Sequence, residues 1–104
     1  MGEMDELIRQ WRRHMRLAIL RALKVAPGNS LNESILHEHL NGGKLRFKAT
    51  RDQVKTEMAW LDKESLAQLE GFESDYLVLT LREAGADIVG GISSHHGVKS
   101  PSLE

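Results

Sequence analysis

The sequence predicts an α+β domain, mainly α, in the order helix, helix, helix, strand, strand, helix. Three observations lead to this class. Apolar residues recur at helical spacing in three early segments, two β-forming runs follow the third segment, and a last helical pattern ends at a pair of glycines. A hairpin directly after a third helix is the order of winged helix-turn-helix domains. We therefore expect three helices, a β-hairpin wing and a C-terminal helix.

Length and composition limit the chain to one domain. With 104 residues, 40% of them hydrophobic, there is material for one core. The absence of cysteine excludes a disulfide framework, a thiol nucleophile and a cysteine-ligated zinc ion. No apolar run is long enough to span a bilayer, and acidic residues occupy the N-terminus, where a signal peptide would be positive. We therefore expect a cytoplasmic protein without a membrane partner.

Positive charge is concentrated in the first half of the chain. Residues 9–55 contain eleven Lys and Arg against three acidic residues, a net charge of +8, whereas residues 56–104 carry −6 and the first eight residues −3. The whole chain has a formal net charge of −1. This polarity predicts a basic surface that could meet a polyanion and an acidic remainder.

Residues 5–24 are predicted to form the first helix, with acidic residues in its first turn, where the helix dipole favours them. Its apolar stripe consists of Ile8, Trp11, Met15, Ala18, Ile19, Ala22 and Leu23, and its other side carries Arg9, Arg12, Arg13 and Arg16. At about 20 residues this helix is longer than a core of this size needs. We therefore expect a homodimer interface through Leu7, Ile8 and Trp11. The alternative is that Trp11 covers the core of its own chain.

A turn and a short second helix follow. Residues 26–29, Ala-Pro-Gly-Asn, should end the first helix and turn the chain. Asn32 is expected to cap a second helix over residues 33–41, which two glycines end. The residues of that helix expected to face the core are Ile35, Leu36 and Leu40. It has the length of a supporting helix.

The third helix is predicted within residues 48–61. The hydroxyl of Thr50 can cap it, and Gln53, three positions on, can bond the amide of the cap, which is the capping-box arrangement. Its apolar stripe consists of Val54, Met58 and Leu61, and its opposite side carries Asp52, Lys55, Thr56, Ala59 and Lys63. One face of this helix therefore belongs to the core and the other is free.

Residues 66–70 and 76–79 are predicted to be the two strands of a hairpin, joined by residues 71–75. This predicted wing carries Glu73 and Asp75 and no Lys or Arg. A wing that lies on phosphates needs cations, so these acids favour a different use of the wing.

The C-terminal part is predicted to hold one more helix and a tail. Thr80 and Glu83 match a second capping box, which predicts a last helix that ends at two glycines. The predicted domain spans residues 1–91. Residues 92–104 are rich in Ser, His and Gly and are expected to be a disordered tail. Residues 103–104, Leu-Glu, match a cloning scar from a C-terminal tag and are not expected to belong to the fold.

Four stretches of the chain resemble a small family encoded in Mu-like phages and prophages. They are RLAILRAL (16–23), NESIL (32–36), RDQVKTEMAWL (51–61) and GVKSPS (97–102). That family is usually described as similar to the ArsR-type winged-helix regulators. The resemblance covers nearly the whole chain and implies a winged-helix fold in a phage or prophage protein. The cysteine ligands of metal-sensing ArsR members are missing here, so metal sensing is not implied.

Cations cluster before and within the third helix, at the positive end of its dipole. The predicted DNA-binding residues are Arg46, Lys48, Thr50, Arg51, Lys55 and Thr56. Arg51, Lys55 and Thr56 would read bases, and the two earlier cations would contact phosphates. Asp52 lies on the same face, where it could accept a hydrogen bond from cytosine but would be repelled by phosphate.

Other chemistry has little support in the sequence. His37 and His39 are two positions apart and so point to different sides of a helix, unlike the i, i+4 pairs that bind zinc. His95 and His96 fall in the predicted tail. The paired glycines end helices instead of opening them, so they are not phosphate loops, and a nucleophile elbow is missing. We expect no metal, no cofactor and no enzymatic activity.

Two functions from different classes are consistent with these patterns. The first is a DNA-binding protein, a phage or prophage transcriptional regulator, whose partner is double-stranded DNA. The second is a protein-interaction module of the same fold without DNA binding, which holds a protein partner through its acidic wing or its first helix. The cationic third helix favours DNA, and the charge of the wing favours the interaction module.

Overall fold

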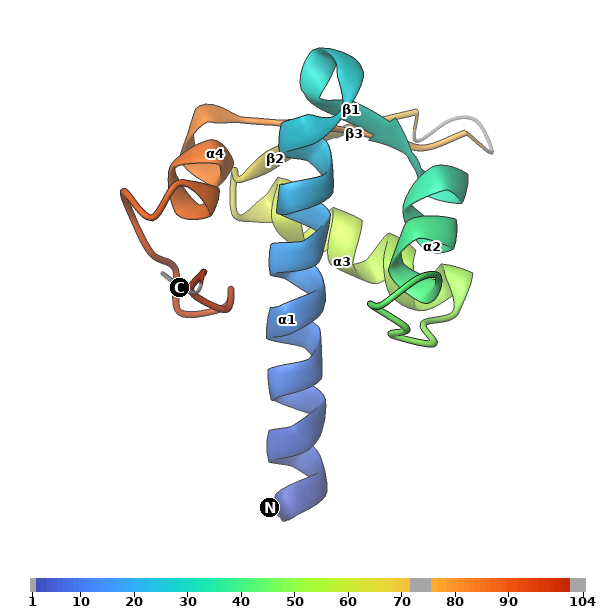
Figure 1. The fold of residues 1–104 in the computed structure, drawn as a ribbon, viewed down its shortest axis with the longest axis vertical. Helices are drawn as coiled ribbons and strands as arrows, with labels where there is room; N and C mark the ends of the chain where they lie inside the picture. The colour runs from blue at the N-terminus through green and yellow to red at the C-terminus, as the bar shows by residue number, and fades with distance from the viewer. Residues whose placement is uncertain (1, 72–75, 102–104) are drawn as a thin grey trace.

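The computed structural model describes residues 2–71 and 76–101 (Figure 1). Its elements are, in chain order, α1 (Glu3–Val25), the 3-10 helix η1 (Pro27–Asn29), β1 (Ser30–Asn32), α2 (Glu33–Asn41), α3 (Arg51–Lys63), β2 (Ala67–Glu70), β3 (Val78–Leu81) and α4 (Glu83–Val89). These elements confirm an α+β, mainly helical domain. The residues predicted to lie at the centre of the wing, Glu73 and Asp75, and the tag-like residues 103–104 are outside the described residues.

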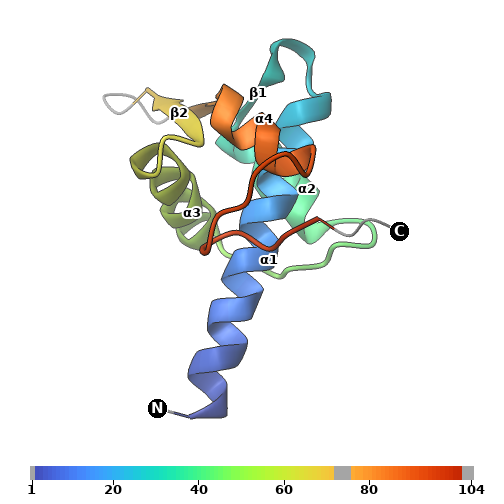
Figure 2. The same cartoon turned by 90° about the vertical axis from the view of Figure 1, so that its left-hand side faces the viewer.

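Helix α1 is the central element, and its two halves differ. Figures 1 and 2 show its second half surrounded by the other elements, while its first turns project from the rest of the molecule. From Met15 onward the helix contributes buried residues to the core, whereas Met4, Leu7 and Ile8 are exposed. The helix is slightly longer at both ends than the predicted range 5–24. It is also long enough to reach beyond the core, as expected from its length.

Helices α2 and α3 begin where the capping residues predict. The side chain of Asn32 accepts from Ile35 N at 2.8 Å, and Thr50 forms the predicted capping box with Gln53. The predicted stripe of α3 is confirmed, since Val54, Met58 and Leu61 are fully buried. In α2, Leu36 and Leu40 face the core as expected.

Ile35 does not face the core. Its side chain is 47% exposed, so the prediction of an inward Ile35 was wrong. Leu36 and Leu40 are one turn apart and form the buried line of this short helix, and Ile35 lies about 100° away from Leu36 around the axis.

The sheet has three antiparallel strands in the order β1-β3-β2. The hairpin of β2 and β3 agrees with the sequence, but β1 was missed, and β3 continues to Leu81. Thr80 was predicted to cap the last helix. It instead lies in β3, where its hydroxyl bonds Ser30 Oγ at 2.9 Å, and α4 begins after Arg82 without a side-chain cap. Pairing with β1 therefore overrides the local capping pattern at Thr80.

Residues 92–101 differ from the expected disordered tail. They pack against α1 and α3, with Val98 only 1% exposed and Lys99 N donating to Arg13 O at 3.2 Å. Gly97 lies directly on the ring of Trp60, where a Cβ atom would overlap the ring. A polar, Gly-containing segment is ordered here because α1 and α3 supply its partners.

Within the described residues, no helix is both long enough and apolar enough to cross a membrane.

Candidate nucleic-acid interface

Helix α3 presents a free outer face. Its capping box is closed in both directions, with Gln53 N donating to Thr50 Oγ1 at 3.1 Å and Thr50 N donating to Gln53 Oε1 at 2.8 Å. This cap fixes the start of the helix at Arg51. The exposed residues of the outer face include Arg51, Asp52, Lys55, Thr56, Ala59 and Lys63. Four of the six predicted DNA-binding residues therefore lie exposed along one stretch of chain, from Thr50 to Thr56.

Glu33 of α2 restrains Arg51 and Lys55 of that face. Arg51 donates from Nε to Glu33 Oε2 at 2.8 Å and from Nη2 to Ser34 Oγ at 3.0 Å. Lys55 Nζ lies 3.9 Å from Glu33 Oε1. The cations expected to read bases are thus engaged within the chain, although about half of each side chain is exposed.

The Glu33 carboxylate is itself buried, at 2% exposure, at the start of α2. Its backbone is held because Glu33 N donates to Leu77 O at 2.9 Å. Oε1 has no hydrogen-bond partner among the described residues. A buried carboxylate in this position is stabilised mainly by the Arg51 guanidinium, because a charge-assisted hydrogen bond is stronger than a neutral one.

Arg46 and Lys48, the predicted phosphate contacts, lie in the loop before α3. Both are exposed, and both have positive φ, +43° and +55°. Phe47 between them is held at two points, with Phe47 N donating to Leu40 O at 2.9 Å and Trp11 Nε1 donating to Phe47 O at 3.2 Å. The loop therefore turns its two cations outward on either side of an anchored Phe47.

Asn41 joins the end of α2 to the start of α3. Its Oδ1 accepts from Ala49 N at 2.6 Å, and its Nδ2 donates to Ala49 O at 2.9 Å and to His37 O at 2.9 Å. Ala49 is buried, next to the exposed Lys48 and Thr50. This double contact fixes the backbone from which both neighbours project.

Two of the remaining site residues have local contacts. Thr56 Oγ1 donates to Asp52 O at 2.9 Å, one turn back in the same helix. Arg46 Nε donates to Gly43 O at 3.0 Å. Asp52 is exposed on the outer face as expected, so that face carries an acid as well as cations.

The sheet lies beside the start of α2. Asn32 Nδ2 donates to the Tyr76 hydroxyl at 2.8 Å, which joins β1 to the segment that enters β3. Tyr76 is exposed. The described part of the hairpin therefore lies next to the start of α2 and its Glu33.

Sequence reasoning missed a buried charge cluster between α1 and α3. Glu57 is 3% exposed and accepts from Arg12 Nε at 2.7 Å and from Arg16 Nε at 2.6 Å. Arg16 also covers the ring of Trp60, with its Cζ 3.8 Å from the ring centroid. The signal was present, because Glu57 falls on the buried line three residues after Val54 and four before Leu61.

The predicted dimer residues are not equivalent in the structure. Leu7 and Ile8 are 63% and 50% exposed on the projecting part of α1. Trp11 is half-buried, packs against the core of its own chain and bonds Phe47 O. Trp11 therefore covers the core of its own chain, which was the alternative to a role in a dimer interface.

The described histidines do not form a metal site. In the part of the chain that the structure describes, no three His, Asp or Glu side chains gather closely enough to hold a metal ion. His95 Nε2 instead bonds Glu64 Oε1 at 2.9 Å, and His95 Nδ1 accepts from Gly97 N at 2.9 Å.

Comparison with known proteins gives the family. A protein of Escherichia phage Mu, described as uncharacterized protein gp26, is 36% identical over 86 residues, which cover 83% of this chain and 85% of the relative. The chain belongs to the gp26 family. A second relative, an uncharacterized protein of Haemophilus influenzae, is 33% identical over 78 residues, or 75% of this chain and 71% of the relative. No family model matches the chain. No solved structure matches it.

Membership of the gp26 family confirms the phage association expected from the resemblance. The descriptions of both relatives name no ligand, partner or activity. In this gp26-family protein, the outer face of α3 and the loop before it carry the exposed cations of residues 44–55.

Proposed function

We propose that this protein is a winged helix-turn-helix protein that binds double-stranded DNA and acts as a phage or prophage transcriptional regulator, similar to the ArsR-type regulators. The order of elements supports the fold: α2, a connecting loop and α3 are followed by the β2–β3 hairpin, and β1 completes a sheet of order β1-β3-β2. In such a domain the third helix enters the major groove and the hairpin lies beside it.

One observation carries the proposal. Residues 44–55 contain five Lys and Arg, all exposed, against one exposed acid, Asp52. Phosphate contacts by such cations supply most of the affinity of a DNA-binding protein, and the positive end of a helix dipole adds to them. In this proposal Arg46 and Lys48 contact phosphates, and Lys55 and Thr56 lie in the groove.

Glu33 sets a limit on base recognition. For Arg51 to form a bidentate contact with guanine, it must give up its bonds to Glu33 and Ser34, which leaves a buried carboxylate short of a partner. The geometry therefore favours binding that depends mainly on phosphates and discriminates little between sequences.

A salt titration of binding to random duplex DNA tests the proposal. With two to four phosphate contacts, log K should fall with log salt concentration with a slope of about −2 to −4, because each contact releases about 0.9 counterion. The absence of binding at low salt would remove the DNA function.

The pairing of Glu33 with Arg51 and Lys55 favours a second candidate, a protein-interaction module. The Glu33 carboxylate already compensates part of the positive charge of Arg51 and Lys55, so the outer face of α3 attracts phosphate less strongly. In that case Arg51→Ala would leave binding to a selected DNA site unchanged, and Asp75→Ala in the predicted wing would abolish capture of a protein partner. A partner that is captured equally well by Asp75→Ala would exclude the wing as its binding surface.

A further inference from the structure

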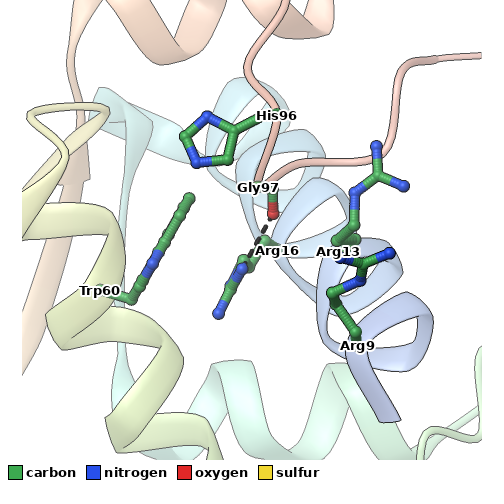
Figure 3. Close-up of a pocket in the computed structure, with 6 residues that line it drawn as sticks. All are labelled: Arg9, Arg13, Arg16, Trp60, His96 and Gly97. Carbon is green, nitrogen blue, oxygen red and sulfur yellow. Dashed lines mark hydrogen bonds between the residues drawn. The ribbon is translucent and has the colours of Figure 1, made fainter. Parts of the chain in front are cut away.

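A cavity of about 480 Å³ lies between α1, α3 and the segment after α4 (Figure 3). Its lining residues are Arg9, Arg13, Arg16, Trp60, His96 and Gly97. Figure 1 shows that this C-terminal segment lies on the opposite side of α1 from α2, so the cavity is separate from the contacts of Glu33. Its volume is within the range of small-molecule sites.

The three arginines share one face of α1 because they are spaced four and three residues apart. Figure 3 shows the side chains of Arg9 and Arg13 on one side of the cavity, Trp60 and His96 on the other, and Arg16 between them. All three arginines line one space that also has aromatic walls, and the guanidinium of Arg16 points toward Trp60.

Arg16 is the fixed member of the set. It donates to Glu57 at 2.6 Å and to Gly97 O at 2.9 Å, and its guanidinium covers Trp60. Its charge is compensated by Glu57, which also pairs with Arg12. One carboxylate therefore faces two guanidinium groups, so this corner of the cavity keeps an excess of positive charge.

Arg13 lacks an acidic partner. It is half-buried, its Nη1 donates to Gln10 Oε1 at 3.0 Å, and its Nη2 reaches Val98 O only at 3.4 Å. Its Nε is buried without a hydrogen-bond partner among the described residues. Within those residues no carboxylate lies within ion-pair distance of Arg13. The partners of Nη1 and Nη2 are both neutral, so the charge of this guanidinium is uncompensated, which favours an anion in the cavity.

Arg9 is at the open side and pairs with Glu6 at 2.7 Å, where both groups are exposed. The pKa of Glu6 is held below its usual value, first because Gln10 donates a hydrogen bond to it and second because Arg9 does. An exposed pair of this kind is weak, so Arg9 can turn to another anion at little cost.

We propose that this cavity binds a phosphate monoester, with Arg13 as its principal ligand and Arg9 and Arg16 as additional contacts. One guanidinium group can donate two parallel hydrogen bonds to two oxygens of a phosphate. A phosphate monoester offers three terminal oxygens and up to two negative charges. A carboxylate carries one negative charge and two oxygens, so it would compensate less of the positive charge of three guanidinium groups. The cavity is larger than a phosphate alone, and the rings of Trp60 and His96 can contact the organic part of the ligand.

The two tryptophans of the chain provide the measurement. The indole N–H resonance of Trp60 reports on the cavity, and that of Trp11, which bonds Phe47 O outside it, is an internal reference. Inorganic phosphate and adenosine monophosphate are added at constant ionic strength, with chloride as the competing anion. The Trp60 resonance should shift with saturation while that of Trp11 stays in place, and the monophosphate should bind more tightly than phosphate.

Arg13→Gln and Arg21→Gln form the matched pair of variants. Both remove one positive charge from α1, but Arg21 is exposed and lies outside the cavity. Arg13→Gln should weaken monophosphate binding about tenfold to a hundredfold, as expected for a lost charge-assisted bond, and Arg21→Gln should leave it unchanged. Arg9→Gln, an exposed change that leaves folding intact, should weaken it about twofold to fivefold.

The source of the phosphate is distinguished with a single-stranded oligonucleotide that carries a 5′-phosphate. A Trp60 shift with the free monophosphate alone assigns a small phosphorylated ligand, and a shift with both assigns a nucleic-acid end as well. No Trp60 shift with either phosphate or monophosphate at millimolar concentration overturns the proposal. Equal loss in Arg13→Gln and Arg21→Gln also overturns it, because the effect would then be one of net charge. None of these measurements depends on duplex DNA binding by α3.

Discussion

Arg51 donates from its Nε to Oε2 of Glu33 at 2.8 Å, so the first residue of α3 is bonded to the first residue of α2. The acceptor is buried and the donor is about half exposed. This bond links the geometry of the helix pair to the charge of the proposed DNA-binding face, because the same carboxylate lies 3.9 Å from Lys55. Changes at Glu33 should therefore alter binding and stability together.

Replacement of Glu33 by Gln should increase DNA affinity. The substitution keeps the shape and an acceptor for Arg51 but removes one negative charge from the face, so the slope of log K against log salt should steepen by about one. Binding to random duplex DNA by fluorescence anisotropy measures this. Unchanged affinity in Glu33→Gln would mean that DNA does not approach this face.

Arg51→Ala provides the complement to that variant. It should lower the free energy of unfolding by about 1 to 3 kcal/mol, since the buried Glu33 carboxylate loses its hydrogen-bond donor. The double variant with Glu33→Gln should recover part of the loss, and denaturant unfolding of all four proteins gives the coupling energy. Additive losses would show that the two side chains do not interact.

Lys48 allows charge and backbone conformation to be separated. Lys48→Ala and Lys48→Gly should weaken binding to all duplex sequences alike and reduce the salt slope by about one. Because φ is +55° at this position, the Gly variant should be more stable than the Ala variant by up to about 1 kcal/mol. Binding titrations and thermal unfolding of the pair test this, and a loss of affinity in only one variant would assign the effect to backbone shape.

Glu57→Ala should lower the free energy of unfolding far more than the replacement of an exposed polar residue would. It leaves Arg16, which is 8% exposed, and the half-buried Arg12 without their common carboxylate, and the loss of one partner of a buried pair costs about 3 to 5 kcal/mol. Urea unfolding measures the change. Thr56→Ala, an exposed change in the neighbouring position, is the control and should stay within about 0.5 kcal/mol of wild type.

The projecting half of α1 predicts a homodimer through Leu7 and Ile8. The sedimentation mass should rise toward two chains with concentration, and Leu7→Asp should return it to one, because a charge at the centre of an apolar contact is costly. A mass of one chain for wild type at high concentration would exclude this interface. Arg21→Gln, which also lowers the net charge by one at an exposed position, is the control for the change in charge.

Local sequence patterns predicted the helices, whereas β1 and the role of Thr80 depend on pairing between distant parts of the chain. The capping box of Thr50 and Gln53 correctly located α3, since all its partners lie within one turn. The similar pattern at Thr80 failed because Ser30, fifty residues away, bonds its hydroxyl in the sheet. β1 has only three residues, too few for an alternating pattern, and exists through its pairing with β3.

The position of the candidate site was predictable from the sequence, but the ion pairs within it were not. The exposure of Arg51 and Lys55 followed from the helical spacing, whereas their contact with Glu33 depends on how α2 and α3 cross. The cavity beside Trp60 could not be predicted either, because it depends on a contact between Gly97 and Arg16, which are 81 positions apart in the chain. A Ser- and Gly-containing segment has no periodic pattern that would indicate such a contact.

The contact of Lys99 N with Arg13 O joins the end of the described chain to its first helix, so it can form only late in synthesis. Synthesis proceeds from the N-terminus, so α1 leaves the ribosome long before residues 97–99, its partners across more than eighty positions. Until then Arg13 and Arg16 face water instead of the carbonyls of Gly97 and Val98. The nascent chain should therefore acquire its helices early and its protection against proteolysis around Trp60 only after the last of these residues has emerged.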